Sequence, residues 1–95
     1  MNSAAIFEEF QLRREVDDAG DTRYYDKNYR LHRDFGPAVI YGDGSKFWYH
    51  RDQLHRLDGP AITWRDGYYD WFIHGKSYSE EDYWKEVERL KNGNY

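Results

Sequence analysis

Short runs of apolar residues alternate with glycine-containing polar pairs along most of this chain. Asp-Gly between two apolar runs is the strongest short-range hairpin signal, because a type I′ turn needs positive φ at both central residues. Asp43-Gly44 and Asp66-Gly67 predict two hairpins, and Gly20-Asp21 predicts a third in a more degenerate segment. As two-residue loops, these turns place a β-branched residue opposite an aromatic one, which is a favourable cross-strand pair. The expected pairs are Val39 with Trp48, Ile62 with Trp71, and Val16 with Tyr25.

The hairpins belong to a 23-residue repeat. Residues 31–38 (LHRDFGPA) recur as residues 54–61 (LHRLDGPA), and the same offset relates the two Asp-Gly turns and takes Trp48 to Trp71. Shifted backwards, it takes Val39 to Val16 and Trp48 to Tyr25, in a first unit as degenerate as capping repeats usually are. Proline has no N–H for a ladder, so each Gly-Pro is expected where a strand begins. Ion pairs of Arg33 with Asp34 and of Arg56 with Asp58 would pin these two turns.

The C-terminal segment follows a helical pattern. Ser79 precedes three acidic residues, a start like a capping box, and apolar residues then recur at helical spacing until Gly93. This predicts a helix over about 80–91 whose apolar stripe packs on the open end of the sheet. At the other end, residues 4–9 are compatible with a short turn of helix, whereas Phe10, Leu12 and Val16 follow strand alternation. Whether the first ten residues are ordered stays open at this point.

Together these elements predict one α+β, mainly β domain over residues 1–95. It is an antiparallel meander of about three repeated hairpins capped by a C-terminal helix. The degenerate N-terminal unit spans 1–21, the repeat sheet 22–78 and the capping helix 79–92. A chain of this size buries well under three quarters of its unfolded surface, so its core needs few, large side chains. Phe, Trp and Tyr make up 20% of the residues and meet that need.

Charge and cysteine content narrow the function classes. The formal net charge is −4, with residues 1–21 carrying −4, residues 22–78 carrying +2 and residues 79–95 carrying −2. A duplex-DNA binder needs a basic stripe, so nucleic acid is disfavoured as a partner. The chain has no cysteine, which suits a cytoplasmic location. Residues 1–6 do not have the pattern of a signal peptide, and we expect no membrane span.

The repeated His-Arg-x-x-Gly-Pro-Ala, followed by Asp-Gly and Trp, resembles a MORN-like repeat, in the version seen in small proteins of bacteriophages and their bacterial hosts. The resemblance covers roughly residues 22–78. It implies an elongated array of β-hairpins used for protein or lipid contact. Similar small acidic phage proteins often act by binding and blocking a host protein, and a phage-encoded chain would act in the cytoplasm of the host cell. The resemblance therefore implies an inhibitor of a host component, such as a CRISPR-type or other anti-phage defence.

Candidate catalytic and metal-ligating residues are few. His32 and His55 occupy equivalent positions in successive units, and two stacked imidazoles would suit a transition metal. No cysteine and no carboxylate at a fixed ligand spacing joins them, so hydrogen bonding within turns is the favoured role. No serine lies in a nucleophile elbow, and the chain has no phosphate-binding glycine motif. We therefore predict no catalytic residues, no metal, no cofactor and no enzyme activity.

The expected function is a non-catalytic protein-binding module. Tyr, Trp and Arg are enriched at interface hot spots, and the strand residues that alternate with the Val39–Trp48 ladder leave a second, aromatic face. The predicted partner-binding residues are Phe47, Tyr49 and Phe72 as anchors, with Arg33, Arg51, Arg56, Glu80 and Glu81 as rim charges. The alternative is a phosphate-bearing ligand, either a nucleic acid or an anionic lipid, held by Arg30, Arg33, Lys46 and Arg56. Self-association through the aromatic face is a further possibility, since a short array leaves sheet edges that need cover.

Overall fold

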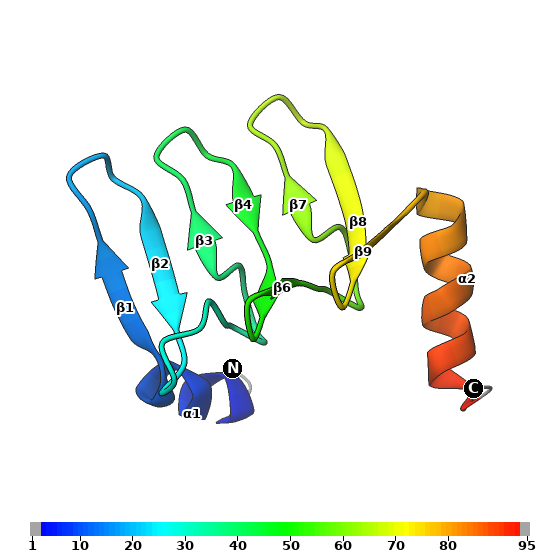
Figure 1. Ribbon diagram of the computed structural model, residues 1–95, viewed down its shortest axis with the longest axis horizontal. Helices are drawn as coiled ribbons and strands as arrows, with labels where there is room; N and C mark the ends of the chain where they lie inside the picture. The colour runs from blue at the N-terminus through cyan, green and yellow to red at the C-terminus, as the bar shows by residue number, and fades with distance from the viewer. Residues whose placement is uncertain (1–2, 94–95) are drawn as a thin grey trace.

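A computed structural model describes residues 3–93 of the chain. Its elements, in chain order, are α1 (Ser3–Gln11), β1 (Arg13–Val16), β2 (Thr22–Tyr25), β3 (Val39–Ile40), β4 (Lys46–Phe47), β5 (Tyr49–His50), β6 (Gln53–Leu54), β7 (Ile62–Thr63), β8 (Tyr69–Ile73), β9 (Lys76–Tyr78) and α2 (Glu80–Lys91). Seven strands form one antiparallel sheet in the order β1-β2-β3-β4-β7-β8-β9, and β5 and β6 form a separate two-stranded ladder. The predicted α+β fold, a meander of hairpins with a C-terminal helix, is confirmed (Figure 1).

Three successive hairpins turn at Gly20, Gly44 and Gly67, at the upper edge of the sheet in Figure 1. Each has a three-residue loop rather than the predicted two-residue loop. In the middle hairpin, Gly44 N–H donates to the Tyr41 carbonyl at 3.0 Å, and Tyr41 N–H donates to the Ser45 carbonyl at 2.9 Å. The glycine is the last loop residue, with φ of 98° in the middle hairpin, as in three-residue loops that end in a glycine bulge.

The longer loop changes the strand register by one residue. Val39 lies opposite Phe47, so its predicted pairing with Trp48 is wrong. Ile62 lies opposite Asp70 and not Trp71, again a shift of one residue. In the first hairpin the loop also lies earlier in the chain than predicted, so Val16 lies opposite Thr22 and not Tyr25. A shift of one residue moves a side chain to the other face of a sheet. Phe47 therefore shares a face with Val39 and Ile62, and Trp48 lies on the reverse.

We call these two faces the Phe47 face and the Trp48 face. The Trp48 face carries one large aromatic residue from each unit, namely Tyr24, Trp48 and Trp71. The equivalent of Trp48 in the first unit is Tyr24 and not Tyr25, because Tyr24 and Trp48 donate their N–H groups to Ala38 and Ala61 in the same way. From the upper turn to this point in the strand, equivalent residues of the first two units are therefore 24 positions apart and not 23.

The extra residue lies in the loops at the lower edge. In the second unit, Arg51 and Asp52 form a two-residue turn with φ of 49° and 69°, the conformation of a type I′ turn. His74 and Gly75 form the equivalent turn in the third unit, with φ of 46° and 80°. In the first unit the corresponding loop is one residue longer and has Tyr29 at φ 60°. The type I′ turns of this protein therefore lie at the lower edge and not at the Asp-Gly pairs.

Each Gly-Pro segment holds an arginine against the aromatic residue of its unit. The guanidinium of Arg56 lies 3.9 Å from the centre of the Trp48 ring and donates to the Pro60 carbonyl at 3.1 Å. A Cβ on Gly59 would lie 2.9 Å from Arg56 Cζ, so the glycine leaves room for the guanidinium. Arg33, Tyr24, Gly36 and Pro37 repeat this arrangement, with the guanidinium 4.0 Å from the ring centre. The repeated Arg-x-x-Gly-Pro is thus a packing motif built on a cation–π contact.

The predicted C-terminal helix is present as α2 and covers the end of the sheet (Figure 1). Ser79 Oγ accepts from Asp82 N–H at 3.2 Å and caps its first turn. Tyr83 and Val87 pack with Ile73 in a buried cluster, which Trp71 borders. The Tyr83 hydroxyl donates to the Arg56 carbonyl at 2.5 Å and accepts from Gly59 N–H at 3.3 Å, so α2 also fixes the second Gly-Pro segment.

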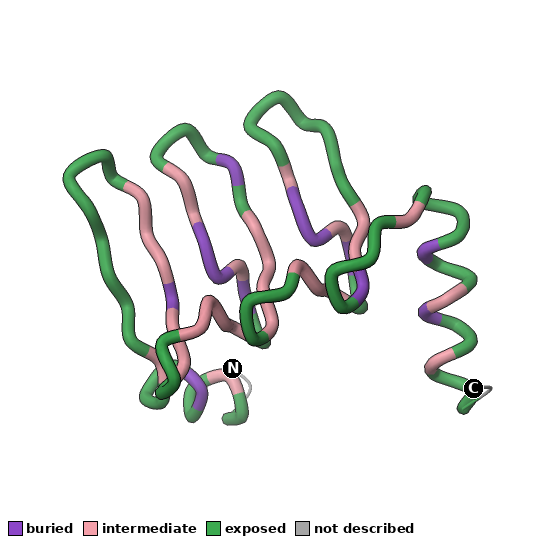
Figure 2. The backbone as a smooth tube through the Cα atoms, viewed as in Figure 1, coloured by how far each residue is buried: buried purple, intermediate pink, exposed green. Residues whose placement is uncertain are grey.

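The N-terminal segment is a full helix and not a strand from Phe10 onward. Helix α1 runs through Phe10, and β1 begins only at Arg13, so the predicted alternation of Phe10, Leu12 and Val16 is wrong. The helix is fixed by Glu8, which is buried although it is charged (Figure 2). Its carboxylate accepts from the backbone N–H groups of Asp34 and Phe35 at 2.8–3.1 Å. Glu8 therefore fixes the first Gly-Pro segment, as Tyr83 fixes the second.

Candidate recognition surfaces and the histidine row

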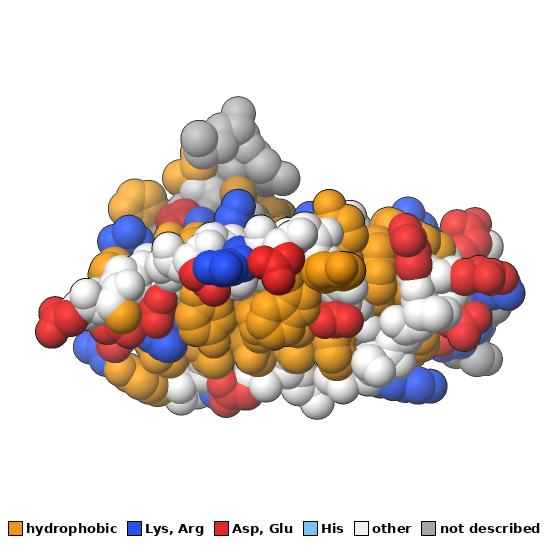
Figure 3. Space-filling view, turned by 90° about the horizontal axis from the view of Figure 1, so that it is seen from above, with side chains coloured by type: hydrophobic (Ala, Val, Ile, Leu, Met, Phe, Trp, Pro, Cys, Tyr) orange, Lys and Arg blue, Asp and Glu red, His pale blue; other side chains and the backbone are white. Residues whose placement is uncertain are grey.

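The predicted anchors Phe47, Tyr49 and Phe72 share the Phe47 face. Val39 and Ile62 lie on this face too, so the prediction that the anchors lie on the reverse of the Val39 ladder is wrong. Phe47 lies at the centre of a cluster of rings, with centroids 5.2 Å from Tyr41, 5.2 Å from Trp64 and 6.4 Å from Tyr49. All four rings are partly exposed. Seen from the upper edge, hydrophobic side chains gather in the middle of the molecule, with charged groups around them (Figure 3).

The two helices contact the other side of the sheet. Helix α2 packs on Trp71 and Ile73, and α1 reaches the Trp48 face through Glu9, which binds Arg33 at 2.8 Å. Because Phe47 lies on the reverse, its cluster of rings has solvent on its outer side. Among residues 3–93, the sheet thus has one face with helical cover at both ends and one face without it.

The predicted rim charges are not gathered around the anchors. Arg33 and Arg56 lie on the Trp48 face, where they stack on aromatic rings and bind Glu9 and Asp58. The predicted pair of Arg56 with Asp58 is confirmed at 2.8 Å, whereas Arg33 selects Glu9 in place of Asp34. Arg51 lies in a lower turn. Glu80 and Glu81 are exposed in the first turn of α2.

The four basic residues of the phosphate-binding alternative do not form a free cationic cluster. Arg30 binds Asp26 at 2.9 Å, and Arg33 and Arg56 are bound to carboxylates as described. Binding a phosphate through the three arginines would compete with these ion pairs, whereas Lys46 is exposed.

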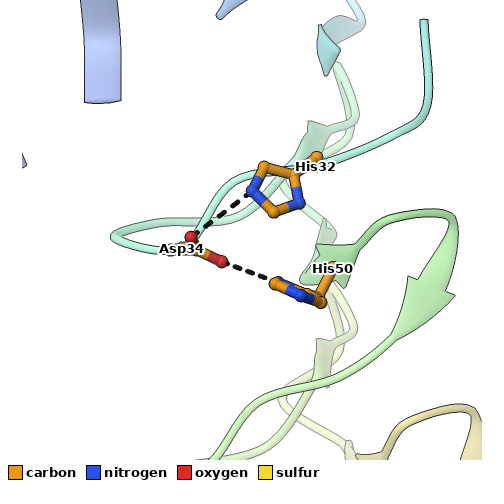
Figure 4. A group of neighbouring side chains, drawn as sticks. All are labelled: His32, Asp34 and His50. Atoms are coloured by element: carbon orange, nitrogen blue, oxygen red, sulfur yellow. Dashed lines mark hydrogen bonds and ion pairs between the residues drawn. The ribbon is translucent and has the colours of Figure 1, made fainter. Parts of the chain in front are cut away.

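The four histidines form a row along the lower edge of the repeat. Successive ring centroids are 4.7 Å apart from His32 to His50, 5.6 Å from His50 to His55, and 4.0 Å from His55 to His74. His32 and His55 are therefore not directly stacked, because His50 lies between them. A carboxylate does join the row, contrary to expectation. Asp34 lies with one oxygen 3.4 Å from His32 Nε2 and the other 2.9 Å from His50 Nδ1 (Figure 4).

His32, Asp34 and His50 bring three possible ligand atoms within 4.8 Å of one another, which makes them a candidate metal centre. The hydrogen bonds of His32 argue against this role. Its Nδ1 accepts the backbone N–H of Arg51 at 3.1 Å, so the neutral ring carries its proton on Nε2, the atom that faces Asp34. A metal-bound histidine normally donates its second ring N–H instead of accepting there. These three residues fit a hydrogen-bond network better than a metal centre.

The same bond recurs in the next unit. His55 Nδ1 accepts the backbone N–H of His74 at 2.9 Å, in the second type I′ turn. The repeated histidine therefore braces the lower turn of the following unit, which is the favoured role from the sequence. Burial, together with the neighbouring His74 and His50, lowers the pKa of His55 to about 4, so the ring is neutral at pH 7.

Asp34 has the opposite balance. Burial raises the pKa of this carboxyl, but the hydrogen bond with His50 and the electrostatic interaction with His32 and His50 outweigh it. Its pKa consequently lies below the usual value. The carboxylate is therefore ionised over the pH range in which most proteins work.

No family model, curated protein or solved structure matches this chain. The MORN-like resemblance stays an expectation from the repeat residues. No helix within residues 3–93 has the length and apolar character needed to cross a membrane.

A groove of about 690 Å³ opens on the Trp48 face. It lies between the two Gly-Pro segments and α2, and Trp48 lines it. Phe35, Leu57 and Trp84 line it too, and they are 49%, 44% and 41% exposed. This groove was not predicted from the sequence, because its walls come from three segments that meet only in the folded chain.

Proposed function

We propose that this protein is a non-catalytic binding module that contacts another protein through its Phe47 face. The observation that supports the proposal is the cluster of rings around Phe47 on the face that has no helical cover. Tyr and Trp supply large contact areas with few rotatable bonds. Because these rings already pack against one another, they lose little further freedom when a partner covers them.

The charges near this face favour a protein over a nucleic acid. Arg23 lies 2.9 Å from Asp17, and its guanidinium lies 5.9 Å from the centre of the Tyr41 ring. Trp64 donates its indole N–H to Asp70 at 2.7 Å. The polar groups around the rings are thus paired within the chain, and a phosphate backbone would find few free cations there. A protein surface that is apolar with some polar groups can cover these rings without needing free cations.

The MORN-like resemblance adds a more specific proposal, in which the partner is a host protein and the module blocks its activity. In that proposal the partner is a component of an anti-phage defence. Nothing in the geometry of the Phe47 face depends on this choice. The test below therefore addresses the surface first and the identity of the partner second.

Tyr68 and Tyr69 allow a matched test of the surface. They are neighbours with 72% and 56% exposure, and the strand register places Tyr68 on the Phe47 face and Tyr69 on the Trp48 face. The wild-type chain is used to capture proteins from the cells in which it occurs naturally, and each captured protein is then purified and titrated by calorimetry. We expect Trp64→Ala and Tyr68→Ala to weaken binding by about 30-fold or more, as for hot-spot residues. Tyr69→Ala should change it by less than about 3-fold.

Equal losses in Tyr68→Ala and Tyr69→Ala, or no specific capture at all, would overturn the proposal. Binding of single-stranded DNA or RNA by the purified chain, with affinity that falls steeply between 50 and 200 mM salt, would support the phosphate-ligand alternative instead.

A further inference from the structure

Helix α1 has its apolar side turned to solvent. Ile6, Phe7 and Phe10 lie on one side of the helix by their spacing and are 42%, 66% and 82% exposed. Glu8, on the side facing the sheet, is 8% exposed. A surface helix normally has the reverse arrangement, with apolar residues inward and charged residues outward. We call Ile6, Phe7 and Phe10 the α1 stripe.

The helix is held in this orientation by specific bonds. Glu8 accepts from the backbone of Asp34 and Phe35, and Glu9 accepts from two nitrogens of the Arg33 guanidinium at 3.1 and 2.8 Å. Rotating the helix to bury the stripe would break these bonds and leave the Asp34 and Phe35 N–H groups without an acceptor. The exposed stripe is therefore a stable feature of the chain, and exposed apolar patches of this kind mark contact sites.

The apolar groove on the Trp48 face begins next to this helix. Glu8 binds the backbone of Phe35, and Phe35 is one wall of the groove. Leu57 and Trp84 line it further along, toward α2. One chain thus carries both an exposed helix stripe and, beside it, a groove in which Phe35, Leu57 and Trp84 are exposed between charged side chains such as Arg33, Arg56 and Lys91.

We propose that the α1 stripe of one copy docks in the groove of a second copy, and that the two copies form a reciprocal dimer. A two-fold arrangement uses the same two elements twice, because each chain supplies a helix and a groove. Aromatic side chains bury about 150–250 Å² each, and Phe7 and Phe10 are 66% and 82% exposed, so docking them removes about 220–370 Å² per copy. Counting both copies and an equal area lost from the two grooves gives about 900–1,500 Å², which overlaps the lower part of the range for a specific interface.

A membrane surface is a poorer occupant for the stripe. Helices that lie in a membrane interface carry Lys or Arg on their polar side. Helix α1 has no basic residue and two glutamates, and the chain as a whole has a net charge of −4. Both features oppose contact with anionic lipids.

The test measures mass in solution. Sedimentation equilibrium and light scattering should show a concentration-dependent dimer for the full chain. Phe7→Glu combined with Phe10→Glu removes the stripe, and Leu57→Glu places a charge in the groove. Each variant should raise the dimer dissociation constant by about 100-fold or more, because a buried unpaired charge is costly. Tyr68→Glu, on the opposite face, is the control and should leave the dimer unchanged.

Mixing the two variants distinguishes docking from general loss of structure. The stripe variant retains an intact groove, and the Leu57→Glu variant retains an intact stripe, so one helix–groove contact can form between them. We expect a heterodimer that is weaker than the wild-type dimer and tighter than either variant with itself. Circular dichroism checks that both variants are folded.

Four results would overturn the proposal. The wild-type chain could stay monomeric at millimolar concentration. A dimer could form that neither the stripe variant nor Leu57→Glu weakens, or the mixture could fail to associate although both variants are folded. Binding of the monomer to anionic vesicles through Phe7 and Phe10 would assign the stripe to a membrane instead. The Phe47 face takes no part in this contact, so the two proposals stand or fall separately.

Discussion

Gly59→Ala is expected to destabilise the protein through Arg56. The new Cβ would lie 2.9 Å from Arg56 Cζ, whereas ordinary contacts begin at 3.4 Å, so the guanidinium must move by about 0.5 Å or more. It cannot move toward Trp48, because it already lies 3.9 Å from the centre of that ring. It must therefore slide out and weaken both the cation–π contact and the bond to the Pro60 carbonyl.

The expected loss follows from these two contacts. A partly buried cation–π contact contributes about 1 kcal/mol, and a hydrogen bond from a charged donor contributes about 1.5–3 kcal/mol. Replacing glycine by alanine restores about 0.4–1 kcal/mol through the unfolded chain. We expect a net loss of about 2 kcal/mol, which for a domain of this size lowers Tm by roughly 8–16 °C. Urea titration followed by tryptophan fluorescence measures the loss.

A double-mutant cycle tests the assigned cause. In an Arg56→Ala background the guanidinium is absent, so Gly59→Ala should be neutral or slightly stabilising. Gly36→Ala should behave like Gly59→Ala, because Arg33 and Tyr24 repeat the geometry. A loss of the same size in both backgrounds would show that the glycine is needed for another reason and would refute the packing argument.

Two further predictions concern the lower turns. The pKa of His55 is about 4 in the folded chain and near 6.5 when unfolded, so the unfolded chain binds the extra proton between these pH values. The resulting stability is complete above about pH 6.5 and is lost as pH falls to about 4. Because the ring is partly exposed, we expect a loss of only about 1–1.5 kcal/mol. The difference between the pH profiles of unfolding free energy for wild type and His55→Gln measures this loss, and parallel profiles would contradict it. Arg51→Asn should stabilise the protein by about 0.5–1 kcal/mol, because asparagine tolerates the left-handed φ of 49° better than arginine. Thermal unfolding measures the gain. A lower Tm would show that the arginine side chain contributes more stability than its backbone conformation costs.

The local pattern predicts which elements form, but not how they are registered. The repeat, the three upper hairpins and helix α2 follow from spacing, glycine positions and a capping serine. Asp-Gly, however, suits a two-residue loop and also the end of a three-residue loop, and the two choices place Trp48 on opposite faces. The type I′ turn at Arg51-Asp52 contains neither glycine nor asparagine, so no turn signal marks it.

The contacts that define the candidate surfaces are long-range, which explains why the sequence does not reveal them. Glu8 binds the backbone of Asp34 across 26 positions, and that bond turns Phe7 and Phe10 outward. Read as a pattern, Phe10 with Leu12 and Val16 is indistinguishable from a half-buried strand. His50 and Asp34 are 16 positions apart and meet only because the lower loops of successive units stack.

The same backbone hydrogen bond joins each unit to the next at both junctions described below. Arg33 N–H donates to the Tyr49 carbonyl at 3.0 Å, and Arg56 N–H donates to the Phe72 carbonyl at 3.2 Å, 23 positions later in both partners. Helix α1 bonds to the Gly-Pro segment of the first unit, and α2 packs on the third unit and bonds to the Gly-Pro segment of the second. A duplicated copy of residues 38–60 would therefore form the same hydrogen bonds to the unit before it and the unit after it. The copy would add two strands to the sheet and increase the separation of α1 and α2 by about 10 Å. The number of repeat units therefore sets the distance between the two helices, in steps of one unit.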